Sequence, residues 1–232
     1  MARSRALLQL GAVVALAAIV VVGAILLSGG GGDDDKASAP ASKAEEDVYA
    51  GIPQDGIHLG KPGAAATLVE IADLQCPFCA AYSREALPSV VRDYVRPGRV
   101  RYELHFRSFL GRDSVRAAGA AAYAASENRM YQFADAFYRN QGPEESGYAD
   151  SDFIRTIARQ VQGLDPEKAV AAANDPLSWP AVKAGEVFAR NLGSTSTPDF
   201  YVRKGGRLQP LNPQGTAPED YARALDAALA GT

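Results

Sequence analysis

Cysteine, histidine and tryptophan are scarce in this sequence of 232 residues, which holds two, two and one of them respectively. Cys76 and Cys79 lie three positions apart. A disulfide stabilises a protein mainly by closing a long loop, and a bridge across two intervening residues closes almost none. The two cysteines are therefore poorly placed to stabilise a fold, and their spacing points to chemistry instead.

The shortage of histidine also bears on metal binding. Zinc needs about four protein ligands in a structural site, or about three and a water molecule in a catalytic one. His58 and His105 have no ligand-like spacing to each other or to the cysteines. The sequence therefore predicts no metal site, and we expect no cofactor.

A strong excess of charge of one sign is absent as well. The formal net charge is −3, while 47% of the residues are apolar and 22% are charged. This balance argues against nucleic-acid binding driven by electrostatics. The length and the apolar content predict one globular domain with a sizeable core, together with an appendage.

The appendage is an apolar run without charges near the N-terminus, at residues 6–27. At about 1.5 Å of rise per residue, a helix of this length spans about 33 Å, close to the hydrocarbon thickness of a bilayer. The apolar region of a cleaved signal peptide is shorter, at about 7–15 residues. We therefore predict an uncleaved transmembrane signal-anchor, and cleavage near residues 28–32 is the alternative.

The charges around this run predict its orientation. Arg3 and Arg5 precede it, and three aspartates follow it at residues 33–35. Because arginine in a short flanking segment favours the cytoplasmic side, we expect residues 1–5 to be cytoplasmic and the rest extracytoplasmic. Residues 28–47 are rich in Gly, Ala, Ser and Asp, which is typical of a flexible tether. The globular domain is then expected at residues 48–232.

The order of predicted elements in this domain is of the α/β class. Strands are predicted from alternating or β-branched apolar residues at 67–73 and 100–106, and a helix from 3.6-residue spacing at 77–95. Further helices are predicted at 114–128, 130–140, 151–160, 166–174 and 178–192. A hairpin of strands 199–202 and 207–211 and a last helix capped by Thr216 complete the chain. His105 falls on the polar face of its strand and is expected to be solvated.

The motif Cys76-Pro77-Phe78-Cys79 directly follows a predicted strand and opens a predicted helix. Unpaired N–H groups and the positive end of the helix dipole favour a thiolate at Cys76. Pro77 fits the first helical turn, and Cys79 lies one turn deeper, within disulfide reach. We therefore predict that Cys76 is the exposed thiol of low pKa and Cys79 the shielded resolving thiol. The alternative is a buried and inert cysteine pair.

Residues 68–79, Leu-Val-Glu-Ile-Ala-Asp-Leu-Gln-Cys-Pro-Phe-Cys, resemble the active-site segment of DsbA-like thioredoxin-fold protein-disulfide oxidoreductases. The likeness is closest to the membrane-anchored, single-domain bacterial branch of that family and covers about residues 57–230. It includes Gly-Lys-Pro-Gly at 60–63 and Gly-Ser-Thr-Ser-Thr-Pro at 193–198. The resemblance implies a thioredoxin-like fold with a helical insertion at about residues 112–192 and a location in the bacterial cell envelope.

The same resemblance implies roles for further residues. A cis peptide bond between Thr197 and Pro198 should face the cysteines and bind substrate. Glu70 matches a buried acid that exchanges a proton with Cys79, although an exposed position on the strand is the alternative. Asp73 is a weaker candidate, for orienting the loop or capping the helix.

Phe78 departs from the pattern, since the best-known members carry a histidine at this position. Phenylalanine cannot donate a hydrogen bond to the Cys76 sulfur, so the disulfide is expected to be less oxidising. The resemblance implies an oxidase that inserts disulfides into cysteine-containing exported proteins and is recharged by a membrane redox partner, a quinone-linked oxidant. A membrane electron donor would be the partner if the enzyme worked as a reductase. An exported reductase or isomerase and a tethered, non-catalytic binding module are the alternatives. A monomer is expected.

Overall fold

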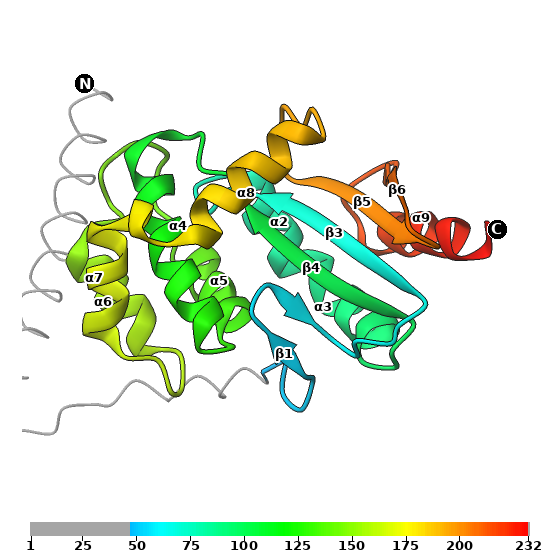
Figure 1. Cartoon of the computed structure of the whole chain (residues 1–232), viewed down its shortest axis with the longest axis horizontal. Helices are drawn as coiled ribbons and strands as arrows, with labels where there is room; N and C mark the ends of the chain where they lie inside the picture. The colour runs from blue at the N-terminus through cyan, green and yellow to red at the C-terminus, as the bar shows by residue number, and fades with distance from the viewer. Residues whose placement is uncertain (1–46, 232) are drawn as a thin grey trace, which may run out of the picture. The chain divides into compact units, whose positions relative to one another are not determined.

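A six-stranded mixed sheet forms the centre of the fold in the computed structural model, which describes residues 47–231 (Figure 1). Its strand order is β1-β2-β4-β3-β5-β6. The strands are β1 (Gln54–Asp55), β2 (His58–Leu59), β3 (Ala66–Ala72), β4 (Val100–Phe106), β5 (Asp199–Lys204) and β6 (Arg207–Pro210). The central pair, β3 and β4, is parallel, and the pairs on either side are antiparallel. The predicted α/β class is confirmed.

The central strand β3 is covered on both faces, because the helices are distributed over both sides of the sheet. In Figure 1, helix α8 crosses one face of β3 and β4, while α2 and α3 lie behind them. Six of the seven residues of β3 are accordingly buried. The strand ends at Ala72, so the loop that carries the cysteines starts at the carboxyl end of a parallel strand.

The first helix is interrupted where the sequence pattern predicted continuity. It consists of α2 (Pro77–Glu85), α3 (Leu87–Val90) and one π-helical turn, η1 (Val91–Val95). Pro88 explains the break, because it lacks an N–H and its ring would clash with the carbonyl of Arg84 in a regular helix. The helical spacing of apolar residues continues across the break. The sequence pattern therefore predicted one continuous helix in spite of Pro88.

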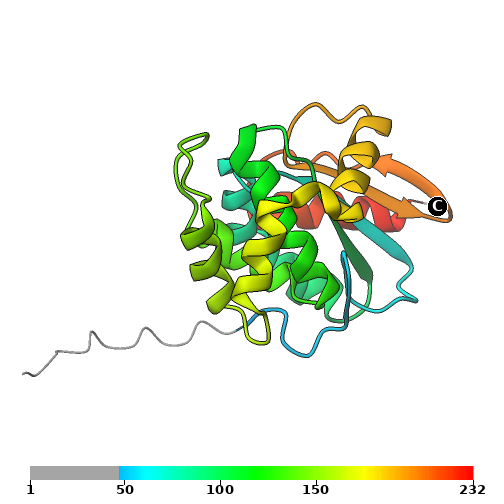
Figure 2. The ribbon, with the colours of Figure 1, turned by 60° about the vertical axis from the view of Figure 1, so that its left-hand side comes forward.

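The predicted helical insertion is confirmed, with bounds within three residues of those expected. It contains α4 (Gly111–Ser126), α5 (Met130–Arg139), α6 (Ser151–Arg159), α7 (Pro166–Asn174), the 3-10 turn η2 (Pro176–Ser178) and α8 (Pro180–Asn191). Figure 2 shows α4 between the sheet and the outer helices α6 and α7. A Cβ atom on Gly119 would overlap the carbonyl oxygen of Ala172, so α4 and α7 pack at a distance that only glycine permits.

The C-terminal hairpin follows its sequence signal closely. Gly205 and Gly206 have φ angles of 56° and 79°, as a two-residue turn of type I′ requires. The last helix is α9 (Pro218–Ala230), and its cap lies one residue after the expected Thr216. Ala217 is the capping residue, because Pro218 occupies the first helical position, and the Ala217 N–H donates to the Asp220 carboxylate.

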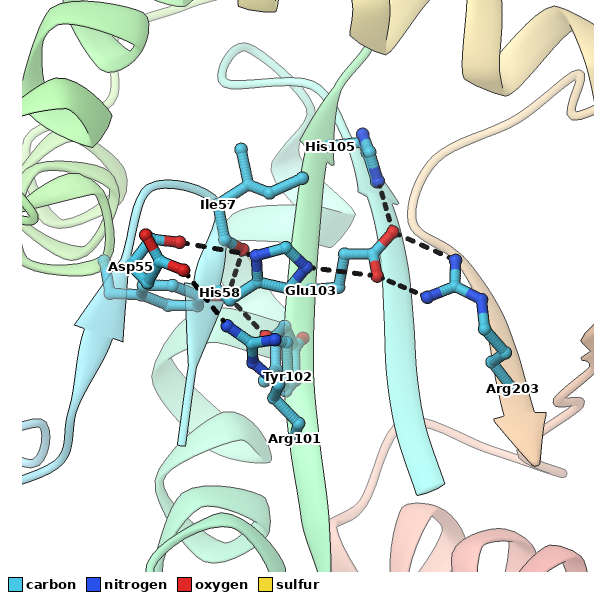
Figure 3. Close-up of polar contacts among 9 residues, drawn as sticks. Asp55, Ile57, His58, Arg101, Tyr102, Glu103, His105 and Arg203 are labelled. Atoms are coloured by element: carbon cyan, nitrogen blue, oxygen red, sulfur yellow. Dashed lines mark hydrogen bonds and ion pairs between the residues drawn. The ribbon is translucent and has the colours of Figure 1, made fainter. Parts of the chain in front are cut away.

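The polar face of β4 is not solvated, so the prediction for His105 is wrong. His105 stacks on Phe188 of α8 with ring centroids 4.0 Å apart, and its side chain is 11% exposed. Figure 3 shows that the Glu103 carboxylate contacts His58, His105 and Arg203. Burial would raise the pKa of Glu103, but bonds from His105, His58 and Arg203 outweigh it and hold that pKa well below its usual range.

None of the helices between residues 47 and 231 has the length and apolar character needed to cross a membrane. The predicted signal-anchor at residues 6–27 and the tether up to residue 46 lie outside the described residues.

Candidate active site

The two cysteines lie at the beginning of α2, as the sequence predicted. Cys76 is the residue that precedes the helix, with φ −70° and ψ 120°, and Pro77 is the first helical residue. The missing N–H of Pro77 costs nothing there, because the first N–H groups of a helix have no intrahelical partner. The N–H groups of Phe78 and Cys79 are among them, and they lower the pKa of Cys76. The helix start therefore stabilises a negative charge on that sulfur.

The pKa of Cys76 is lowered from 9.0 to about 6. The largest cause is a hydrogen bond from the Cys79 thiol; burial opposes it, and the Thr197 side chain and the two helix N–H groups add to the lowering. Cys76 is thus mostly a thiolate at neutral pH. The predicted low pKa is confirmed, even though Phe78 replaces the histidine and points away, with 68% of its surface exposed.

The predicted exposure of Cys76 is wrong, because only 4% of its surface is accessible. The reason is the loop before β5, whose Thr197 carbonyl oxygen accepts a hydrogen bond from the Cys76 thiol at 3.2 Å. Cys79 is completely buried, as predicted. Burial raises its pKa well above the usual value, and Cys76 and Glu70 add to the increase. The two sulfurs therefore differ sharply in acidity.

The bond between Thr197 and Pro198 is cis, as the resemblance implied. The Thr197 carbonyl of this bond accepts the hydrogen bond from the Cys76 thiol. A hollow of about 300 Å³ is lined by Pro198 together with Leu211 and Tyr221. The predicted substrate-binding pair and the cysteines thus share one end of the sheet.

Glu70 is buried rather than solvated, so the structure decides between the two readings of this residue. It lies in β3 with 3% of its surface exposed, and its Oε2 accepts a hydrogen bond from the Tyr102 hydroxyl at 2.6 Å. Burial raises the pKa of Glu70 to about 7; the Tyr102 hydrogen bond lowers it and the Cys76 charge raises it. A carboxyl group with this pKa is suited to exchanging protons near neutral pH.

Asp73 orients the active-site loop, which was the first of its two predicted roles. Its carboxylate accepts hydrogen bonds from the N–H groups of Gln75, Phe109 and Leu110 and from the Ser114 hydroxyl. It does not cap α2, whose first residues receive no side-chain cap. Burial raises the pKa of Asp73, and these four hydrogen bonds oppose that increase.

Three residues of the insertion hold the same loop and were not found from the sequence. The Gln141 amide donates to the carbonyls of Leu74 and Cys76, at 2.8 and 3.2 Å. The Tyr138 hydroxyl donates to the carbonyl of Asp73, and the Glu145 N–H donates to Gln75. These contacts join positions about 65–70 apart in the chain, and no local pattern marks them.

Phe78 and Phe109 are two of the large apolar side chains that remain exposed, and the Arg107 guanidinium lies 4.7 Å from the centre of the Phe109 ring. Between residues 47 and 231, no three His, Cys, Asp or Glu side chains are placed to hold a metal ion.

Residues 53–219 match the model of a protein family described as Thioredoxin. The probable disulfide bond formation protein D of Bacillus cereus is 28% identical over 166 residues, which cover 70% of this chain and 68% of that protein. The oxidised crystal structure of BdbD from Bacillus subtilis superposes with a TM-score of 0.66 at 20% identity, covering 78% of this chain and 98% of that one. DsbA from Chlamydia trachomatis gives a TM-score of 0.62 at 17% identity, covering 74% and 90%. At these identities, the two structures establish a shared fold.

Proposed function

The chain belongs to the thioredoxin family, and we propose that it is a protein-disulfide oxidoreductase whose Cys76–Cys79 pair exchanges a disulfide with dithiols of other proteins. The observation that carries this proposal is the acidity difference between the two sulfurs, with the pKa of Cys76 near 6 and that of Cys79 raised well above its usual value. The Cys76 sulfur is suited to forming mixed disulfides and to leaving them, and the Cys79 sulfur is suited to resolving them. The Bacillus cereus relative, named for disulfide bond formation, supports the oxidase direction.

The reaction begins with the Cys76–Cys79 disulfide. A substrate thiolate attacks the Cys76 sulfur, a mixed disulfide forms, and the electron pair of the broken bond goes to Cys79. Cys79 then takes up a proton, because burial disfavours its thiolate. The second substrate thiolate attacks the substrate sulfur of the mixed disulfide, and Cys76 leaves as a thiolate. Two electrons have passed from the substrate dithiol to the cysteine pair.

Glu70 supplies the proton that Cys79 needs, directly or through a water molecule. Its carboxyl group is buried near the sulfur, as the effect of Glu70 on the pKa of Cys79 indicates. With its own pKa near 7, it is protonated in a large share of molecules at neutral pH. The departing Cys79 thiolate accepts this proton and leaves Glu70 ionised.

The oxidase direction follows from the stability of the Cys76 thiolate. Anything that stabilises this thiolate stabilises the reduced protein and makes the disulfide a stronger oxidant. Helix N–H groups and the Cys79 thiol do so here without a histidine at position 78. We expect a reduction potential less negative than the about −270 mV of thioredoxin.

The substrate segment binds against the loop that carries Thr197 and Pro198. The Thr197 carbonyl lies 3.2 Å from the Cys76 sulfur, so an extended chain whose cysteine reaches Cys76 passes within hydrogen-bonding reach of it. Main-chain pairing of this kind holds a peptide with little dependence on its sequence. It suits an enzyme that acts on many exported proteins.

The location completes the proposal. Residues 6–27 anchor the protein in the cell membrane, with residues 1–5 in the cytoplasm and the catalytic domain outside. This is where disulfides form and persist. The substrates are cysteine-containing exported proteins, and a membrane redox partner restores the Cys76–Cys79 disulfide.

The test uses the oxidised full-length protein in detergent and a reduced, unfolded protein that needs disulfides to fold. Thiol counting should show that the substrate loses two thiols for each Cys76–Cys79 disulfide consumed, and Cys76→Ser should abolish this exchange. Gln160→Ala, an exposed change in the insertion, is the control and should exchange normally. Exchange that persists in Cys76→Ser would refute the proposal, and equilibration with a glutathione buffer would decide the direction.

A further inference from the structure

A chain of three buried polar side chains leads away from the cysteines, and the reaction above uses only its first member. Glu70 of β3 accepts from the Tyr102 hydroxyl of β4 at 2.6 Å, and the Tyr102 and Tyr82 hydroxyls are 3.1 Å apart. Tyr82 lies in α2, one turn beyond Cys79. All three side chains are buried.

Tightly packed rings hold the two hydroxyls in place. The Tyr82 ring lies 4.7 Å, centre to centre, from both Phe200 and Tyr221. The Tyr102 ring meets Tyr131 edge-on at 5.8 Å. Because these rings are fixed by their neighbours, the hydrogen bonds to Glu70 do not depend on a mobile side chain.

The titratable groups whose electrostatic interaction with Glu70 shifts a pKa are thiols and phenols. They are Cys76, Cys79, Tyr49, Tyr82, Tyr102, Tyr131, Tyr138 and Tyr221, and the neighbour of Glu70 in β5, Phe200, is not titratable. Within residues 47–231, no lysine, arginine or histidine pairs with Glu70. A buried carboxylate without a cation depends on hydrogen bonds for its stability.

We propose that Tyr102 is a positioning residue that, together with Tyr82, allows buried Glu70 to change its protonation state during disulfide exchange. The two hydroxyls form a hydrogen-bonded chain whose direction reverses with the proton on Glu70. This inference rests on the proposed function, because it concerns the proton that Cys79 takes up.

The donor and acceptor capacities of the three groups support this inference. A hydroxyl group donates one hydrogen bond and accepts others, whereas a carboxylate only accepts. When Glu70 is ionised, Tyr102 donates to Glu70 and Tyr82 donates to Tyr102. When Glu70 is protonated, it donates to Tyr102, which in turn donates to Tyr82. Both states keep the two hydrogen bonds, and no heavy atom has to move.

The consequence for the exchange step follows directly. As the Cys76–Cys79 bond breaks, the proton passes from the Glu70 carboxyl to the Cys79 sulfur, and negative charge appears on Glu70 instead. The Tyr102 hydroxyl turns and stabilises that charge. A cation at this position would hold Glu70 ionised, and an apolar side chain would hold it protonated; a tyrosine permits both states.

The experiment follows the carboxyl carbon of Glu70 by NMR in the oxidised full-length protein, labelled with carbon-13 glutamate and held in detergent micelles. In the oxidised protein neither sulfur titrates, and Glu70→Gln identifies the signal. Tyr102→Phe removes the hydroxyl that donates to Glu70. Tyr131→Phe is the matched control, since Tyr131 is equally buried but its hydroxyl donates to the backbone of Ile57 and Tyr102.

Tyr102→Phe should raise the midpoint of the Glu70 titration by about one pH unit or more, because a hydrogen bond to the charged form is lost. The control should stay within about 0.3 units of the unmodified protein. An unchanged midpoint in Tyr102→Phe, or an equal shift in both variants, would overturn the inference. If Tyr102→Phe does not fold, Tyr82→Phe is titrated instead and should give a smaller increase in the same direction; no increase would overturn the inference equally.

A kinetic measurement links this shift to the exchange step. The rate at which dithiothreitol reduces the oxidised protein is followed against pH. In Tyr102→Phe the inflection due to Glu70 should move upward with the NMR midpoint, whereas the control profile should not move. If the protein exchanges no disulfide at all, the proposed function is refuted. If exchange is normal but the inflection due to Glu70 does not move in Tyr102→Phe, only the role of Tyr102 is refuted.

Discussion

The Cys76 sulfur lies 3.2 Å from the carbonyl oxygen of Thr197, a residue 121 positions later in the chain. The thiol can donate a hydrogen bond to this carbonyl, but the thiolate cannot. Ionisation of Cys76 therefore frees the carbonyl to accept an N–H from a bound segment. The Thr197 carbonyl therefore covers the Cys76 thiol in the free protein and can bind a substrate segment once Cys76 is a thiolate.

The first prediction concerns the acidity of Cys76. In the reduced protein, the rate of alkylation by iodoacetamide should rise with pH through a midpoint near 6, because only the thiolate reacts. Cys79 should remain unmodified in the native state at neutral pH, since it is buried and its pKa is raised. Mass spectrometry of the peptides identifies the modified sulfur. The absence of modification at both sulfurs at neutral pH would rule out the proposed activity.

The second prediction concerns the division of roles between the sulfurs. Cys79→Ser retains the attacking sulfur but lacks the resolving one, so mixed disulfides with substrate proteins should accumulate through Cys76. They should appear on a non-reducing gel and disappear when reductant is added. Cys76→Ser should give no such adducts; adducts through Cys79 in that variant would reverse the assigned roles.

The third prediction concerns Glu70 and stability. The unfolded chain releases this proton at a pKa of about 4.3, whereas the folded protein keeps it up to about 7. The folded state thus binds more protons between these values, and Glu70 lowers the free energy of unfolding as pH rises through that window. Glu70→Gln should therefore be more stable than the unmodified protein at pH 8, by up to about 3 kcal/mol.

Urea unfolding at pH 4 and pH 8 tests this. The gain in stability should be small at pH 4, where both states are protonated, and large at pH 8. Equal stability differences at both pH values would contradict the raised pKa of Glu70. The same variant should exchange disulfides more slowly, because Cys79 loses its proton donor.

The fourth prediction concerns Glu103, which lies on the face of the sheet opposite to that of Glu70. Its partners are drawn in Figure 3. Its folded pKa lies well below the unfolded value, so its contribution to stability is present above about pH 4.3 and is lost as pH falls below it. Glu103→Gln should lower the free energy of unfolding at pH 7 by about 2 kcal/mol, because Arg203 loses its carboxylate. The alkylation midpoint of Cys76 should not change. A shift in that midpoint would show that the two faces are coupled.

The fifth prediction concerns the support of the active-site loop by the insertion. Gln141→Leu removes the side-chain amide that donates to the carbonyls of Leu74 and Cys76, although the Cys76 carbonyl still accepts the Ala80 N–H. The change should cost about 1–2 kcal/mol of stability. It should also slow exchange, because the loop that presents Cys76 is less constrained. Gln160→Ala serves as the control and should change neither quantity by more than about 0.5 kcal/mol or twofold. Equal losses in both variants would mean that Gln141 acts only through general stability.

The type of chemistry was determined by the sequence alone, because its signals are local. Two cysteines three positions apart, after a strand and at the start of a helix with Pro77 between them, specify a dipole-stabilised thiolate with a partner one turn away. The Gly205–Gly206 turn and the helices of the insertion were equally predictable, since each depends on residues close together in the chain. The break at Pro88 was also a local signal, but the continuing apolar spacing outweighed it.

Only the tertiary structure decided how each polar group is surrounded. Glu70 and His105 both lie in strands, and the sequence could not tell that α8 would cover the face with His105 and α2 the face with Glu70. The covering of Cys76 by Thr197 and the support of its loop by Gln141 join segments 121 and 65 positions apart. The pKa of a buried group depends on desolvation and on its neighbours in space, which are set when the last hairpin joins the sheet and the insertion packs against it.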